Sequence, residues 1–245
     1  MNKLETLKDW VNPRYLQNLD PFDKDDLEAG VVLDDFLDPA RLALVENFMS
    51  SEAEYRELYR IVDKTDKLGV PEVTREEWQA CPPSGRFCFR KLVSGARSGF
   101  HESRNYLAYR ELWSFFESTL FAYLLAKLTG EIYRPSVWAA ISHEQEHFLV
   151  PHTDNRADRK LNVIFYLSSG WKENFGGELT LLEDGKRSKS VAPLFNRLVL
   201  LKPRKGNEHQ VEFLTPEAET WQRFCFVIRC TDPLAMADKK SQDDY

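Results

Sequence analysis

The spacing of apolar residues changes once along this chain, near residue 137, and that change limits the folds open to it. Before this point apolar residues recur at helical spacing. The clearest case is 109–129, where a stripe of Leu, Phe and Tyr predicts one helix that ends at Gly130. After it, apolar and polar residues alternate in short runs. The change predicts helices followed by many short strands.

Eight short strands are predicted in the second part of the chain. They are expected at 137–142, 147–151, 161–168, 177–183, 188–192, 197–202, 209–214 and 222–229. Gly-Gly, Asp-Gly and Lys-Gly-Asn turns separate several of them. The fold class is therefore mainly β with N-terminal helices, and the strand count favours a double-stranded β-helix, the jelly-roll or cupin-like barrel.

The same pattern gives one domain with two short ends. Residues 1–29 are polar and charge-rich and are expected to form an N-terminal extension. The domain spans 30–234, with a helical support at 30–136 and a barrel at 137–234, and a charged mobile tail follows at 235–245. Within the support, we expect a short strand in 30–37 and a helix that begins at Asp38-Pro39. With 42% apolar residues, the 245-residue chain can bury a packed core.

Charge and cysteine content narrow the possible functions. The net charge of -6 argues against a protein that mainly binds nucleic acid or anionic lipid. No run approaches the roughly 18 apolar residues of a membrane span, and the N-terminus lacks the apolar core of a secretory signal. The four cysteines form no CxxC pair and are expected to be reduced. We therefore expect a cytoplasmic protein that binds neither nucleic acid nor membrane.

A candidate metal site lies between the predicted strands. His152 and Asp154 are two residues apart, so on an extended segment both side chains leave from the same face. His209 opens a later strand and can supply a third ligand. Two imidazoles and a carboxylate suit Fe(II) with open positions, whereas a structural zinc site uses four ligands. The triplet alone is weak evidence, because His-x-Asp arises by chance in many chains.

Three polar residues on the predicted barrel strands strengthen this hypothesis. Tyr166 and Asn162 lie on one face of the strand at 161–168 and place hydrogen-bonding groups inside a barrel. Arg223 begins the apolar run Arg-Phe-Cys-Phe-Val-Ile, and an arginine in a core run usually pairs with an anion. A guanidinium inside the barrel can bind a carboxylate through two hydrogen bonds.

In order, these motifs resemble the prolyl-hydroxylase branch of the Fe(II)/2-oxoglutarate oxygenases. The similarity covers roughly 137–230. It is carried by His-Thr-Asp-Asn, Phe-Tyr-Leu-Ser-Ser-Gly-Trp, Gly-Gly-Glu-Leu-Thr-Leu-Leu, Pro-Leu-Phe-Asn-Arg-Leu-Val-Leu-Leu, Glu-His-Gln-Val and Arg-Phe-Cys-Phe-Val. The resemblance implies that the catalytic metal ligands are His152, Asp154 and His209.

The resemblance also implies a co-substrate pocket. Arg223 would pair with the 5-carboxylate of 2-oxoglutarate, and Tyr166 would donate a hydrogen bond to the same group. Asn162 is a further cofactor-binding candidate. Arg229 shares the face of Arg223 by strand parity and, with Asn155, is a candidate substrate contact at the barrel mouth.

Two stretches depart from the pattern of this branch. The segment before the triplet runs from Ser142 to His147, where the branch often carries a tyrosine and a Pro-Gly turn. We expect His143 and His147 to lie in a turn or on the rim as surface residues. The interval between His209 and Arg223 is also slightly long, which affects the placement of Arg223.

The implied activity is hydroxylation of an unactivated C–H bond with Fe(II), 2-oxoglutarate and O2. Asp154 fills the position that a halide would need, so hydroxylation is favoured over halogenation. The substrate stays open between a prolyl residue in a peptide or protein, a free amino acid and a carrier-bound biosynthetic intermediate. Two alternatives remain, a non-catalytic jelly-roll that binds a metal or small ligand and a cupin-type enzyme that does not use 2-oxoglutarate. The first gives no reason for Arg223 and Tyr166.

Overall fold

The computed structural model describes residues 6–17, 19–61, 72–145, 147–155 and 158–233, and two antiparallel sheets dominate it. The larger sheet has the spatial order β1 (Val31–Leu33), β10 (Leu198–Leu201), β7 (Arg159–Tyr166), β12 (Arg223–Thr231), β5 (Arg134–His143), β4 (Arg86–Ala96), β2 (Ala53–Ile61) and β3 (Glu72–Val73). The smaller has the order β6 (Leu149–His152), β11 (Asn207–Val211), β8 (Leu179–Glu183) and β9 (Lys186–Val191).

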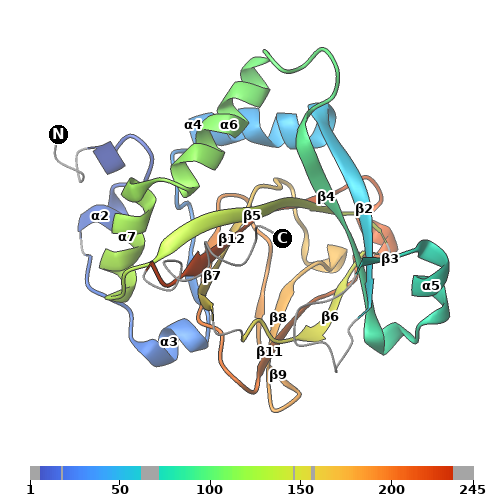
Figure 1. Cartoon of the computed structure of the whole chain (residues 1–245). Helices are drawn as coiled ribbons and strands as arrows, with labels where there is room; N and C mark the ends of the chain where they lie inside the picture. The colour runs from blue at the N-terminus through green and yellow to red at the C-terminus, as the bar shows by residue number, and fades with distance from the viewer. Residues whose placement is uncertain (1–5, 18, 62–71, 146, 156–157, 234–245) are drawn as a thin grey trace, which may run out of the picture.

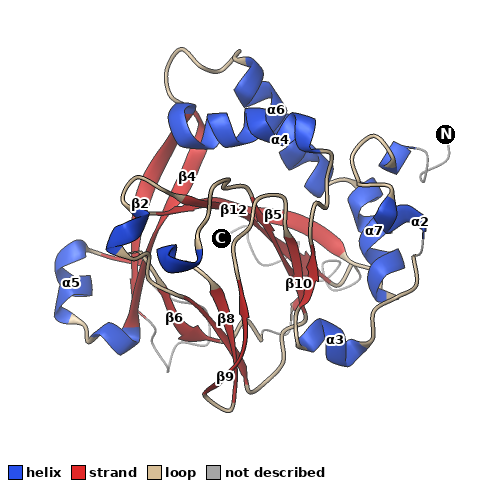
Figure 2. Ribbon diagram, turned by 180° about the vertical axis from the view of Figure 1, so that it is seen from behind, coloured by secondary structure: helices blue, strands red, loops and turns tan. Residues whose placement is uncertain are grey.

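The helices lie mainly outside the larger sheet. They are α2 (Arg14–Gln17), α3 (Lys24–Glu28), α4 (Pro39–Asn47), α5 (Arg75–Ala80), α6 (Arg104–Phe116) and α7 (Thr119–Thr129). Figures 1 and 2 show α4, α6 and α7 on one side of this sheet and the smaller sheet on the other. None of the described helices is long and apolar enough to cross a membrane.

Alternation along the central strands separates two core clusters. On β12, Phe224 and Phe226 pack toward the helices, whereas Cys225 belongs to the cluster between the sheets. On β7, Phe165 faces the helices and Tyr166 the barrel interior. Because successive strand residues point to opposite faces, this pattern assigns each polar side chain of these strands to the barrel or to the helical layer.

The predicted jelly-roll fold is confirmed. Each of the eight strands expected after residue 137 is present as β5 to β12, with bounds shifted by a few residues. The helix predicted from Asp38-Pro39 is also present, and the Asp38 carboxylate accepts a hydrogen bond from the backbone N–H of Ala40 over 2.9 Å. The strand expected within 30–37 is β1.

The single helix predicted over 109–129 is wrong, because the chain forms two helices there. α6 ends at Phe116, and the Ser118 hydroxyl caps α7 by accepting from the backbone N–H of Phe121 over 3.1 Å. Gly130 ends α7 as predicted, with a left-handed φ of 71°.

The described residues before residue 30 pack against the rest of the domain. Leu7, Val11 and Leu27 are buried in the cluster under the helices, and the Trp10 and Phe115 rings stack with centroids 4.6 Å apart. The boundary at residue 29 stays a prediction. The predicted tail at 235–245 lies outside the described residues.

Candidate metal centre

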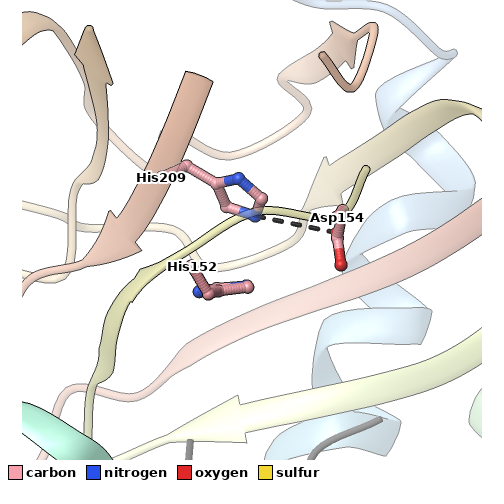
Figure 3. A group of neighbouring side chains, drawn as sticks. All are labelled: His152, Asp154 and His209. Carbon is pink, nitrogen blue, oxygen red and sulfur yellow. Dashed lines mark ion pairs between the residues drawn. The ribbon is translucent and has the colours of Figure 1, made fainter. Parts of the chain in front are cut away.

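His152 at the end of β6, Asp154 in the segment that follows it and His209 on the neighbouring β11 lie together (Figure 3). His152 and His209 are direct cross-strand partners, with ring centroids 4.3 Å apart. Oδ2 of Asp154 lies 3.7 Å from Nε2 of His209. One possible ligand atom from each residue lies within 4.8 Å of the other two. Small side-chain rotations therefore suffice to bring all three to one ion.

Both imidazoles are suited to ligation. Nδ1 of His152 lies 2.8 Å from the backbone oxygen of Val150, so a proton on Nδ1 leaves Nε2 for a metal. Burial, reinforced by the neighbouring His152, lowers the pKa of His209 to about 3. A neutral ring keeps the lone pair that a metal needs.

Two side chains of β7 orient the Asp154 carboxylate. Arg159 forms an ion pair with Oδ1, and the amide nitrogen of Asn162 donates to Oδ2 over 2.9 Å. Burial raises the pKa of Asp154, but electrostatic interactions with His209, His152 and Arg159 outweigh it, and the pKa falls to about 2. The carboxylate is therefore ionised and fixed. The sequence suggests Asn162 as a cofactor contact, and in the structure its amide nitrogen faces Asp154.

Arg223 lies inside the barrel and is 2% exposed. One terminal nitrogen donates to the Tyr166 hydroxyl over 3.2 Å, and the other lies 3.2 Å from Nδ1 of His143 and 3.6 Å from Sγ of Cys225. Its Nε has no hydrogen-bond partner, and no carboxylate of the described residues pairs with the guanidinium. Burial opposes the charge, but Tyr166 and Cys225 favour it, and the pKa of Arg223 is raised. A buried charge without a counter-ion is costly, so this geometry suits an anionic ligand.

A glycine pair covers this end of the barrel. A Cβ on Gly177, whose φ is +77°, would lie 3.3 Å from Cδ of Arg223. A Cβ on Gly176 would lie 2.1 Å from the backbone oxygen of Phe213. The sequence shows this pair only as a turn, whereas in the fold it lets two loops close over Arg223.

The surface placement expected for His143 and His147 is wrong, since they are 1% and 5% exposed. Arg223 always donates, so Nδ1 of His143 accepts and the ring proton sits on Nε2. That Nε2–H is buried and has no partner among the described residues. Burial, with Arg223 and His147 adding, holds the pKa of His143 well below its usual range.

The buried, neutral His143 predicts a pH dependence of stability. In the unfolded chain this histidine takes up a proton near its ordinary pKa of about 6.5, whereas the native ring does not. The unfolded state therefore binds more protons below that pH, and the free energy of unfolding falls as the pH falls. When the pH falls from 7 to 5.5, the free energy of unfolding measured in urea should decrease by about 1 kcal/mol less in His143→Gln than in the wild type. Parallel curves for the two proteins would contradict this assignment.

A cavity of about 420 Å³ opens beside the triad. Asp154, Asn162 and His209 line its inner end, and α3, β8, β9 and the segment 201–204 form its walls. Arg223 and Tyr166 are not among its lining residues, because they lie deeper in the barrel. The cavity is thus the approach from solvent to one side of the triad.

The two predicted substrate residues do not line this cavity, but each is next to a residue that does, Asn155 to Asp154 in the chain and Arg229 to Asn162 across the strands. Asn155 is exposed, and its backbone N–H donates to the Thr153 hydroxyl over 3.1 Å. Arg229 is the cross-strand partner of Asn162, and its guanidinium lies 4.0 Å from the centroid of the Trp138 ring. Arg159 was not suggested by the sequence, because a charged residue at the start of a strand usually faces solvent.

Comparison with known proteins finds a matching family model and several similar structures. Residues 138–228 match the family model described as the 2OG-Fe(II) oxygenase superfamily. No curated protein matches the chain. One similar structure is a prolyl hydroxylase from Trichoplax adhaerens in complex with a peptide fragment of the hypoxia inducible factor oxygen degradation domain. It is 16% identical, with 85% of this chain and 86% of that chain covered and a TM-score of 0.52.

A second similar structure is an oxidoreductase of the 2OG-Fe(II) oxygenase family from Burkholderia pseudomallei. It is 13% identical, with 86% of this chain and 91% of that chain covered and a TM-score of 0.53. At such identities the likeness shows a common fold. The family implies Fe(II), 2-oxoglutarate and O2, and the matched segment contains the whole triad as well as Tyr166 and Arg223. Residues 138–228 therefore belong to the 2OG-Fe(II) oxygenase superfamily, and the chain around them has a prolyl-hydroxylase-like fold.

Proposed function

We propose that this protein is an Fe(II)- and 2-oxoglutarate-dependent oxygenase that hydroxylates an unactivated C–H bond of a prolyl residue or an amino-acid-like substrate. The observation that carries the proposal is Arg223, a buried guanidinium without an anion in the described residues, in the same barrel as a three-ligand triad. A protein that only bound a metal would have no use for this buried charge.

The donor set fits Fe(II). His152 and His209 offer imidazole nitrogens and Asp154 an ionised carboxylate, and among the described residues no fourth ligand completes the group. Three ligands with open positions are typical of non-haem iron oxygenases. When bound, iron and 2-oxoglutarate supply the oxidising power that cleaves O2, with one oxygen atom entering the substrate and the other succinate.

Three side chains form the proposed pocket for the 5-carboxylate of 2-oxoglutarate. Arg223 contributes the positive charge. The Tyr166 hydroxyl accepts from Arg223, so its own proton is directed elsewhere and can be donated to the carboxylate. His143 adds the buried Nε2–H as a third donor. Charge-assisted hydrogen bonds of this kind orient the co-substrate relative to the triad.

The remaining residues hold the metal ligands and admit the substrate. Arg159 and Asn162 fix the Asp154 carboxylate, which such outer contacts commonly do in metal sites. The cavity beside the triad is the proposed entrance for the C–H bond to be oxidised. Arg229 and Asn155, which neighbour Asn162 and Asp154 of its lining, are the proposed substrate contacts. A prolyl peptide is one candidate substrate, because one similar structure is a prolyl hydroxylase with a bound peptide.

The proposal is tested by following 18O from labelled O2 into the products. The full chain, loaded with Fe(II) and 2-oxoglutarate, is incubated under 18O2 with a small-molecule extract and a library of proline-containing peptides. We expect one product to gain a single 18O atom, with an equal amount of succinate and strict dependence on 2-oxoglutarate. Oxygenated products that form equally well without 2-oxoglutarate would overturn the proposal in favour of a cupin-type reaction.

A further inference from the structure

Four cationic side chains, from β2, β4 and β12, share the barrel-interior face of the larger sheet. Arg56 is paired with Lys91 across β2 and β4, and Leu58, two residues along β2, packs in the barrel-interior cluster. Strand alternation therefore puts Arg56 and Arg60 on the interior face with Leu58. Arg229 of β12 reaches the same face. We call Arg56, Arg60, Lys91 and Arg229 the basic patch.

Trp138 of β5 lies between two residues of the basic patch, Arg229 of β12 and Lys91 of β4. The guanidinium of Arg229 is 4.0 Å and Nζ of Lys91 is 5.0 Å from the centroid of its ring. Trp138 is an extra residue in β5, because Val227 pairs with Ala139 and Ile228 with Val137. Such a bulge redirects a side chain and is common beside active sites. Here it brings an aromatic ring under two cations.

The basic patch reaches the candidate metal centre through Arg229. This residue is the cross-strand partner of Asn162, whose amide holds Asp154. A ligand held at Arg229 is therefore a neighbour of the triad.

The charges of the basic patch act on one another. Burial, followed by the charges of Arg60, Arg229 and Arg56, lowers the pKa of Lys91. Glu72 opposes this shift, but it forms its own ion pair with Arg56 at 3.0 Å. No carboxylate of the described residues forms an ion pair with Lys91. Lys91 is thus a partly buried cation among like charges, and such a group is typical of binding sites.

We propose that the substrate carries an oxyanion, a carboxylate or a phosphate, which binds between Lys91 and Arg229 beside Trp138. The inference rests on the function proposed above and names the substrate class of that site. The anion fixes one end of the substrate on the basic patch, and the C–H bond extends from it toward the triad. A solvated strand face would give no reason for two cations on one ring beside a metal centre.

The experiment measures how anions protect Lys91 from acetylation. The full chain, loaded anaerobically with Fe(II) and saturating 2-oxoglutarate, receives a brief pulse of acetic anhydride at pH 8, and peptide mass spectrometry reports each lysine. Acetate and inorganic phosphate are titrated in separate arms at constant ionic strength with chloride. The exposed Lys127 of α7 is the internal control.

We expect either anion to slow labelling of Lys91 several-fold and to leave Lys127 unchanged. The half-protecting concentration should rise about tenfold in Arg229→Gln and change little in Arg229→Lys. The anion that protects at lower concentration tells whether the substrate group is a carboxylate or a phosphate. Equal protection of Lys91 and Lys127, or no effect of Arg229→Gln, would overturn the inference.

Different results would refute the oxyanion site and the proposed function. The visible charge-transfer band of iron-chelated 2-oxoglutarate is recorded on the same samples. A band in the wild type together with unprotected Lys91 would refute the oxyanion site alone. Absence of the band would refute the proposed function and, with it, the assignment of this anion to a substrate.

Discussion

Replacing Arg223 with glutamine is expected to weaken 2-oxoglutarate binding by about two to three orders of magnitude. Removal of one partner from a buried, hydrogen-bonded charge pair typically costs about 2–5 kcal/mol, and the expected loss of affinity lies in the middle of this range. The Tyr166 hydroxyl stays in place, so the loss reports the guanidinium itself. Anaerobic isothermal titration of the Fe(II)-loaded protein with 2-oxoglutarate measures it.

The stability of the same variant separates a binding role from a structural one. In the ligand-free protein the Arg223 charge is buried without an anion, so Arg223→Gln should leave the free energy of unfolding unchanged or raise it. The matched control is Arg197→Gln. Arg197 makes a two-point ion pair with Asp34, at 2.5 and 2.9 Å. Loss of this pair should lower the free energy of unfolding by about 1 kcal/mol and leave the affinity for 2-oxoglutarate unchanged. A destabilised Arg223→Gln with wild-type affinity for 2-oxoglutarate would refute the proposed pocket.

Replacing Asp154 with alanine is expected to abolish succinate formation and to lower Fe(II) affinity by more than about 100-fold. The carboxylate is the one anionic ligand of the triad, and two imidazoles alone bind Fe(II) weakly. The variant also leaves Arg159 buried without its carboxylate, so the free energy of unfolding should fall by roughly 2–4 kcal/mol. Iron content, succinate release and urea unfolding are measured on the same preparation.

Thr153→Ala is the control for Asp154→Ala, because Thr153 is the exposed residue between the two ligands. It should keep iron, succinate formation and nearly all of the stability. Wild-type succinate formation in Asp154→Ala would contradict the assignment of this carboxylate as a ligand.

Sequence alternation predicts the barrel well because its strands are half-buried, and half-burial leaves a period of two. The prediction fails where a helix cap or interior charged residues determine the structure. The break between α6 and α7 depends on the Ser118 cap, which an uninterrupted apolar stripe conceals. Strand β2 was missed because its interior positions include Arg56 and Arg60, so the residues of the basic patch replace the apolar residues that would mark a strand.

Some residues of the candidate site can be predicted from the sequence and others cannot. The triad is visible in the sequence because one strand spacing supplies two ligands and the opening of another strand supplies the third. Arg159, which pairs with Asp154, and His143, which contacts Arg223, are not visible, because arginine usually faces solvent and histidine has no strong preference for burial. Only the register between β5 and β12 shows that His143 lies opposite Arg223 inside the barrel.

The central claim is that one barrel holds both iron and 2-oxoglutarate, and anaerobic titration with Fe(II) followed by 2-oxoglutarate tests it most directly. We predict that the wild-type chain develops the weak visible charge-transfer band of a chelated keto acid, saturating at one equivalent of iron. Arg223→Gln should need about 100-fold more 2-oxoglutarate for the same band. Binding of iron without a band at any 2-oxoglutarate concentration would contradict the account and favour a metal site that does not use this co-substrate.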